Sequence, residues 1–160
     1  MNVGNGLNNL ALLLVDQGRY AEAEPLLRRA LSIQEKKGGR EYAHVAATLN
    51  TLATLRKNQG RYTDAEPLFR RALSVTKKTS GFDHPAVAVI TNNLAEVCHL
   101  LGRFREAETL YRQAIMILEK ALGPDNSDVA MALNNLASVY QDEQRYAEAE
   151  PLFQRALSIN

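Results

Sequence analysis

Pairs of amide side chains recur at a fixed interval along this 160-residue chain. Successive copies are 42 residues apart: the pairs are Asn8-Asn9, Asn92-Asn93 and Asn134-Asn135, and in the second copy Asn50 is followed by Thr51. An amide both donates and accepts hydrogen bonds, so a row of them can grip the backbone of an extended peptide without reading its sequence. Asparagine is also a mediocre helix former, so its return in the middle of predicted helices needs a reason.

Two explanations are open for the first member of each pair. The amides can form a structural ladder in which each one bonds to the neighbouring helix. Alternatively, they can face a ligand and bind its main chain. The sequence does not choose between the two for this position.

The other reactive side chains lack the spacing that chemistry requires. His44, His84 and His99 show no metal-ligand spacing with one another or with Cys98. Cys98 falls on an expected core position and is predicted to be a buried small hydrophobe. Paired carboxylates stand at predicted helix starts and do not form a facing acid and base. We therefore predict no catalytic residue, no metal, no cofactor and no enzymatic activity.

Composition excludes two classes of partner. The chain has 19 Lys and Arg against 18 Asp and Glu, whereas general nucleic-acid binders carry a clear basic excess. No apolar run approaches the roughly 20 residues that a membrane span requires. The single cysteine cannot form an internal disulfide, and the chain starts without the pattern of a signal peptide. These features predict no nucleic acid, no membrane and a cytoplasmic location.

The interval of 42 residues belongs to a repeat that runs through the whole chain. Leu10-Ala11 returns as Leu52-Ala53, and Arg19 returns as Arg61. Each copy reads as a first helix, A, a Gly-Arg turn and a second helix, B. We predict one domain over 1–160 with repeats at 4–45, 46–87, 88–129 and 130–160, the last one truncated.

Local signals mark the ends of these helices. Glycine before the turn can cap helix A in the left-handed conformation, and Gln144 replaces it in the fourth copy, which predicts the weakest cap there. Linkers 81–85 and 123–128 offer glycine to end helix B and Asp or Ser to cap the next helix A. The first linker, 38–42, is degenerate and predicted to be looser. Prolines one turn into helix B indicate a late helix start or a slight bend; they are Pro25, Pro67 and Pro151.

The angular positions of residues on helix A separate a core side from a ligand side. In the first copy the core side holds Leu7, Leu10, Ala11 and Leu14. The opposite side should line the concave groove of a stacked array. From it we select the predicted binding residues: Asn8, Asn9, Asn50, Thr51, Lys57, Asn92, Asn93, His99, Asn134 and Asn135.

Helix B carries an ordered charge pattern. Its first turn is acidic and its later part basic, which complements the helix dipole. Glu24–Arg28 and its equivalents Glu66–Arg70 and Glu108–Arg112 are spaced to pair across one helical turn. The Arg and Lys doublets are therefore predicted to be a solvated face with no ligand.

The small residues at three fixed positions of each repeat resemble the tetratricopeptide pattern; in the first copy they are Ala11, Ala23 and Ala30. The repeat length and the phrases LNNLA, GRYAEAEPLLRRALSI and LGPDNSDVA resemble kinesin light chain and its prokaryotic relatives. This resemblance implies an all-α fold, a right-handed α-solenoid of four repeats. It also implies that the second asparagine of each pair contacts peptide, which applies to Asn9, Asn93 and Asn135.

Three hypotheses for function follow. The leading one is a scaffold that binds an unknown protein or peptide in the groove. Grooves of kinesin light chains that take acidic peptides use basic residues at positions where this chain has Asn5, Ala47, Val89 and Met131, so a neutral peptide is expected. The second is an architectural array with weak end-to-end self-association through apolar ends. The third is a fragment of a larger multidomain protein.

Overall fold

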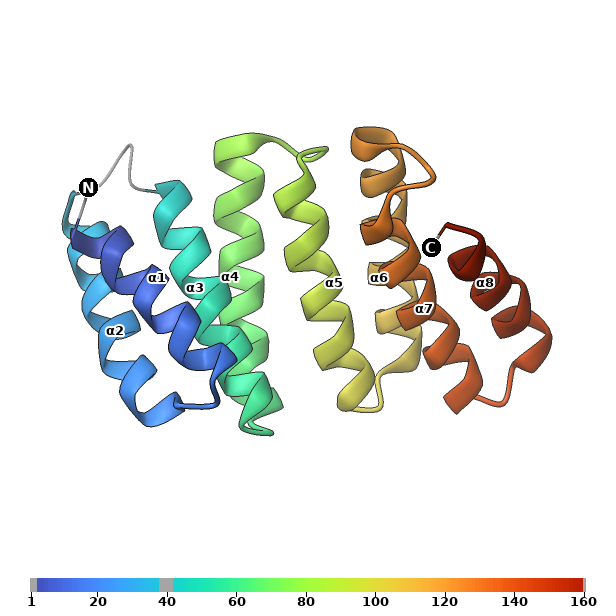
Figure 1. Ribbon diagram of the computed structural model, residues 1–160, viewed down its shortest axis with the longest axis horizontal. Helices are drawn as coiled ribbons and strands as arrows, with labels where there is room; N and C mark the ends of the chain where they lie inside the picture. The colour runs from blue at the N-terminus through green and yellow to red at the C-terminus, as the bar shows by residue number, and fades with distance from the viewer. Residues whose placement is uncertain (1–2, 38–41, 160) are drawn as a thin grey trace. The chain divides into compact units, whose positions relative to one another are not determined.

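The computed structural model describes residues 3–37 and 42–159, and the regular structure in those ranges is entirely helical (Figure 1). Eight helices in this part of the chain form four hairpins. They are α1 (Val3–Asp16), α2 (Tyr20–Lys37), α3 (Tyr42–Asn58), α4 (Tyr62–Ser80), α5 (Pro85–Leu100), α6 (Phe104–Leu122), α7 (Ser127–Asp142) and α8 (Tyr146–Ile159). The predicted all-α fold of four helix–turn–helix repeats is confirmed. The first linker, predicted to be looser, lies outside the described residues except for Tyr42.

The chain divides into two compact units, residues 1–81 with α1–α4 and residues 82–160 with α5–α8. In the first unit α3 packs on both α1 and α2, and in the second unit α7 packs on both α5 and α6. The odd-numbered helices are the A helices of the sequence pattern and the even-numbered ones are the B helices. The single domain over 1–160 and the right-handed superhelix stay predictions.

The Gly-Arg turn closes each hairpin in the same way. In the first copy the amide of Arg19 donates to the Leu14 carbonyl at 2.8 Å, and the amide of Gly18 donates to Val15 at 2.9 Å. This pair of bonds satisfies carbonyls at the end of the helix and requires a left-handed residue. Gly18 has φ 73° and Gln144 has φ 59°, so the fourth copy keeps the turn with a side chain in a strained conformation.

Three details of the predicted helix starts are wrong. The residue that caps α5 is His84, whose Nδ1 accepts from the Ala86 amide at 3.1 Å. The residue that caps α7 is Asn126, whose Oδ1 accepts from the Asp128 amide at 2.9 Å. Asp and Ser were expected at these positions, but any side chain with an acceptor two residues before a free amide can serve. The late start suggested by proline is also wrong, because α2 begins at Tyr20 and continues through Pro25.

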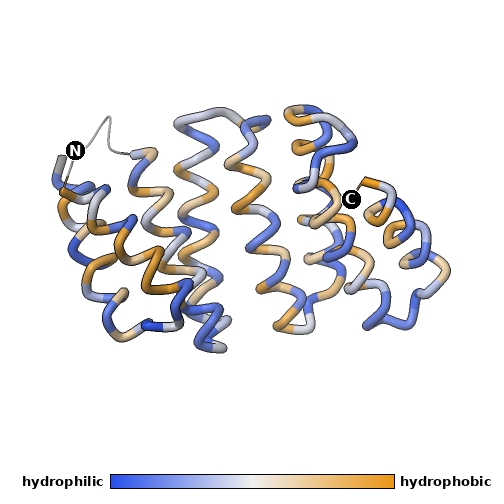
Figure 2. The backbone as a smooth tube through the Cα atoms, viewed as in Figure 1, coloured by the Kyte–Doolittle hydropathy of each residue, from blue (hydrophilic) through white to orange (hydrophobic). Residues whose placement is uncertain are grey.

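The core is built from small residues that let the helices approach. Ala11, Ala23 and Ala30 have no exposed surface, as the tetratricopeptide pattern implies. Hydrophobic and hydrophilic segments alternate along each helix, as amphipathic packing requires (Figure 2). The prediction that Leu10 lies in the core is wrong, since it is 49% exposed, whereas its equivalent Leu52 is buried at the joint with the first repeat. In this unit Leu52 of α3 packs against residues of the repeat formed by α1 and α2.

The predicted pairs on the B helices form. The distances are 2.8 Å for Arg28–Glu24, 2.8 Å for Arg70–Glu66 and 3.1 Å for Arg112–Glu108. Glu24 also forms an ion pair with Arg56, which occupies a core position of α3 and is 6% exposed. The hydrogen bond from Arg56 lowers the pKa of Glu24 and outweighs the opposing effect of burial. A charge on the core side is thus neutralised where two repeats meet.

Candidate peptide-binding face

The A helices present most of the predicted binding residues at partly open positions. Asn9 is exposed, whereas Asn92 and Thr51 are buried with 7% and 5% of their surface accessible. The remainder are half-buried: Asn8, Asn50, Lys57, Asn93, His99, Asn134 and Asn135. This face is therefore neither fully solvated nor part of the core, which suits side chains that hold a ligand.

In the first unit a chain of polar contacts joins three helices. Thr48 Oγ1 of α3 donates to Gln34 Oε1 of α2 at 2.9 Å, and Gln34 Nε2 donates to Asn5 Oδ1 of α1 at 3.4 Å. The Asn5 amide nitrogen lies 3.2 Å from His44 Nε2 of α3. Gln34 is only 1% exposed, so its amide needs these partners.

A glycine makes room for this buried glutamine. A Cβ built on Gly4 would lie 3.1 Å from Gln34 Cγ, tighter than ordinary van der Waals contact. The other repeats have alanine at the Gly4 position, namely Ala46, Ala88 and Ala130. The place of Gln34 is taken there by Thr76, Leu118 and Asn160. The pairing of Gly4 with Gln34 is thus particular to the first repeat.

These side chains surround a hollow of about 220 Å³. It is lined by Asn5, Asn8, Asn9, Gln34, His44 and Ala47. Among the described residues, Asn8 Oδ1 is the buried side-chain oxygen that has no hydrogen-bond donor. A buried acceptor left in this state costs about 1–3 kcal/mol, which a bound donor can recover.

The equivalent asparagine of the second unit is satisfied internally. Asn92 of α5 accepts a bond from Asn135 Nδ2 of α7 at 3.3 Å. Asn8 and Asn92 occupy the same repeat position, and the residue that corresponds to Asn135 in the first unit is Thr51. Thr51 Oγ1 donates to the Ala47 carbonyl of its own helix at 3.1 Å. In the first unit the position equivalent to Asn135 is therefore occupied by a threonine, and no amide there can donate to Asn8.

Another contact joins α5 and α7 toward their carboxyl ends. His99 Nε2 lies 2.7 Å from Asp142 Oδ2, and the imidazole packs edge to face on Phe104 at 5.7 Å between centroids. His99 was expected to be a wall residue of the groove, and these contacts hold its ring in place. No acyl, phosphoryl or metal chemistry follows from this pair, because a lone histidine and carboxylate lack the nucleophile that such a pair would activate.

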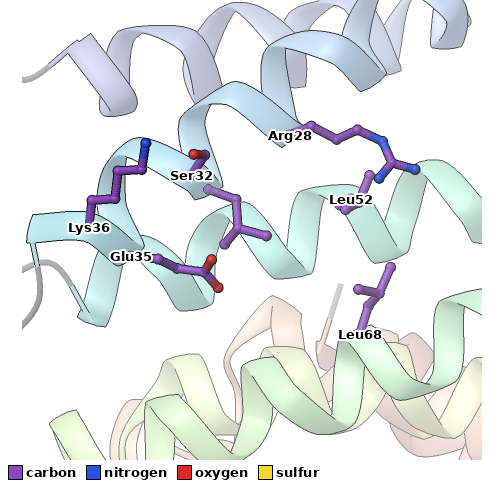
Figure 3. A pocket seen from close by; sticks show the side chains of 7 residues that line it. Arg28, Ser32, Glu35, Lys36, Leu52 and Leu68 are labelled. Atoms are coloured by element: carbon purple, nitrogen blue, oxygen red, sulfur yellow. The ribbon is translucent and has the colours of Figure 1, made fainter.

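A larger hollow of about 500 Å³ lies between α2, α3 and α4. Figure 3 shows Arg28 and Lys36 toward its two ends, with Leu52 and Leu68 among the apolar side chains that line it. Two of its charged lining residues are engaged in ion pairs, Arg28 with Glu24 and Glu35 with Arg71. The hollow holds none of the predicted binding residues, and we assign it no ligand.

Sequence reasoning missed part of the first-unit site. Thr48, His44 and Gln34 were not among the predicted binding residues. The available signal was the occurrence of Gln34 at a position where the repeat otherwise has apolar or short side chains. Within the described residues, no helix is long and apolar enough to cross a membrane. No cluster of three or more potential metal ligands occurs there either.

Solved structures with similar folds include light-chain-like proteins. BtubC (BKLC) from P. vanneervenii is 28% identical, with a TM-score of 0.89 over 99% of this chain. RapI in its apo form is 17% identical, with a TM-score of 0.87 over 98% of this chain. The chain spans 63% of the BtubC structure and 55% of the RapI structure.

A third similar structure is a putative kinesin light chain from Podosopora anserina with nearly identical repeats. It is 21% identical, with a TM-score of 0.62, and the match covers 97% of this chain and 93% of that one. No curated protein matches the sequence. The model of the tetratricopeptide repeat matches residues 2–78, 44–120 and 86–160. The chain belongs to the tetratricopeptide repeat family.

Proposed function

We propose that this chain is a non-catalytic scaffold that holds an extended segment of a partner protein against its A helices. The observation that carries the proposal is the gathering of amide groups on adjacent A helices. In the first unit Asn5, Asn8 and Asn9 line one hollow with side chains of α3, and in the second Asn92 meets Asn135. Repeats of this family generally mediate protein–protein interactions, and a cytoplasmic location remains the expectation from the sequence.

The proposed ligand is a neutral peptide bound mainly through its backbone. Amides supply both donors and acceptors, which matches the alternating N–H and C=O groups of an extended chain. Lys57 is almost the only cation of the predicted binding face, so affinity should depend little on salt. A steep salt dependence would indicate the Arg and Lys doublets of the B helices as the binding site.

Binding can be tested with peptides selected from a random library on the immobilised protein. We expect micromolar affinity, about −8 kcal/mol, and a clear loss in the double variant Asn93→Ala/Asn135→Ala. The control is Gln113→Ala/Gln154→Ala, which removes two amides from the B helices. Circular dichroism should show both variants folded. If the selected peptides bind the asparagine variant as tightly as the parent, the amide-grip proposal fails.

A second candidate is an array that assembles through its ends. Leu157 on α8 is 75% exposed, and Leu10 on α1 is 49% exposed. Burying both in a head-to-tail contact would remove apolar surface from water at roughly 25 cal/mol per Å², which gives a weak contact for one helix face. Light scattering over a wide concentration range should show reversible growth that Leu157→Glu suppresses. A protein that stays monomeric throughout would exclude this candidate.

A further inference from the structure

We infer that the hollow of the first unit is a subsite for a side-chain amide, such as that of glutamine, in a bound peptide. The inference rests on the proposed function and adds a chemical preference to it. Its starting point is the difference between Asn8, whose oxygen has no donor among the described residues, and Asn92, whose oxygen accepts from Asn135.

Thr51 explains why Asn8 lacks a donor. In the second unit the amide at this repeat position crosses from α7 to α5. Threonine in the first unit is shorter, and its hydroxyl proton is already given to the Ala47 carbonyl. Asn8 Oδ1 thus stays closed off from water and unbonded, a state that is unfavourable until a ligand supplies a donor. Because Asn8 Oδ1 accepts no hydrogen bond, rotation of the Asn8 side chain can bring this oxygen to the hollow without breaking a hydrogen bond that the oxygen makes.

The hollow is suited to a neutral group. None of its lining residues is a carboxylate, an ammonium or a guanidinium. A buried cation or anion would lack a partner of opposite charge there and would lose its hydration, which is costly. The volume of about 220 Å³ exceeds the roughly 30 Å³ share of one water molecule several times over, so a side-chain amide fits.

A primary amide matches the donors and acceptors available. Its NH₂ can donate to Asn8 Oδ1, and its carbonyl can accept from the exposed amide of Asn9. A carboxylate of the same shape has no proton to donate and would place an oxygen against Asn8 Oδ1. An aliphatic side chain would leave that oxygen unsatisfied. The subsite should therefore distinguish glutamine from glutamate and from methionine, which are close to it in size.

The probes are three blocked amino acids, N-acetyl-N-methylamides of glutamine, glutamate and methionine. Each is titrated into the full chain while the side-chain amide resonance of Asn8 is followed by NMR. We expect the Kd fitted from these shifts to be at least tenfold lower for glutamine than for glutamate or methionine, a difference of about 1.4 kcal/mol. Equal responses to the three probes would overturn the inference.

Matched threonine substitutions supply the controls. Thr51→Asn provides the missing donor, so it should abolish the glutamine response. The same change at Thr109 on α6, whose hydroxyl likewise donates to a carbonyl of its own helix, should leave the response intact. If Thr51→Asn proves poorly folded, Asn8→Leu removes the acceptor directly. In this variant the side-chain amide resonance of Asn9, which also lines the hollow, is followed instead, and its response to glutamine should be lost. A glutamine response that survives in folded Asn8→Leu would overturn the inference. Selected peptides that bind without any glutamine preference, yet are weakened by Asn93→Ala/Asn135→Ala, would refute the subsite and leave the proposed function standing.

Discussion

The two units are built from the same repeat but differ in how the polar side chains of their A helices are hydrogen-bonded. The first unit gathers Asn5, Gln34 and His44 beside an oxygen without a donor. At the same repeat positions the second unit has Val89, Leu118 and Asp128, and its Asn92 is bonded to Asn135. The same helix–turn–helix pattern thus holds an oxygen without a donor in one unit and a closed contact in the other. The position of an asparagine on helix A is set by its own repeat. Whether its side-chain oxygen already accepts a hydrogen bond depends on the residue that the neighbouring repeat places opposite it.

The same contrast applies to the glutamate that joins the repeats. Glu24 pairs with the buried guanidinium of Arg56, whereas its equivalent Glu108 accepts from Tyr140 at 2.7 Å and from Arg145 at 2.9 Å. Arg145 also lies over the Tyr140 ring, 4.2 Å from its centroid. Burial raises the pKa of Glu108, but the hydrogen bonds from Arg145, Tyr140 and Arg112 outweigh it, so the pKa lies below its usual value.

The largest expected effect comes from removing the charge of each glutamate. Glu24→Gln leaves the nearly buried Arg56 without its counter-charge and should cost about 3 kcal/mol of the free energy of unfolding. Glu108→Gln should cost about 1 kcal/mol, because Tyr140 is neutral and Arg145 keeps Glu143 and Glu148. Urea unfolding of both variants measures the difference. Equal losses of unfolding free energy in the two variants would show that Glu24 and Glu108 stabilise the contacts between repeats in the same way.

Packing of small residues should not distinguish the units. Ala65 and Ala149 occupy the same repeat position and are 0% and 4% exposed. Replacing Ala65 by leucine should over-pack a helix contact and cost roughly 1–3 kcal/mol, and Ala149→Leu should cost a similar amount. Thermal unfolding of the two variants checks this. A loss near zero for Ala65→Leu would mean that the assigned core face is wrong.

Acid should weaken the contacts that Glu24 makes with Arg56 and that Glu108 makes with Arg145, and so lower the stability of the protein. The pKa values of Glu24 and Glu108 are lowered in the folded protein, so their stabilisation is present above the unfolded value of about 4.3 and is lost as pH falls through the folded value. Stability of the parent should therefore decline below about pH 5. The decline should be shallower in Glu24→Gln, when unfolding is followed at a series of pH values. An unchanged slope would contradict the assigned role of Glu24.

The smallest expected effect concerns the turns. Gln144 adopts a left-handed φ of 59°, where the first three copies have glycine. Gln144→Gly should stabilise the protein by about 1 kcal/mol, whereas Gly18→Gln should destabilise it by a similar amount. Differential scanning calorimetry can resolve both changes. A loss of stability in Gln144→Gly would show that its side chain makes contacts that matter more than the strain.

The sequence predicted most of what depends on one repeat, apart from two cap residues and the effect of proline, and it failed where two repeats meet. The helices, the turns and the buried alanines follow from periodicity within a copy, and each was found. Leu10 was misplaced because the burial of its equivalent Leu52 comes from contact with another repeat, not from its own hairpin. The missing donor for Asn8 was not foreseen, since it depends on Thr51 in the next copy.

The central claim is that asparagines of the A helices hold the ligand. The most direct measurement is a titration of the protein with a library-selected peptide, following the side-chain NH₂ resonances of all asparagines. The account predicts that the resonances of Asn9, Asn93 and Asn135 shift and saturate, while the guanidinium signals of Arg29 and Arg71 on the B helices stay in place. Saturable binding with unmoved asparagines and shifted B-helix arginines would contradict it.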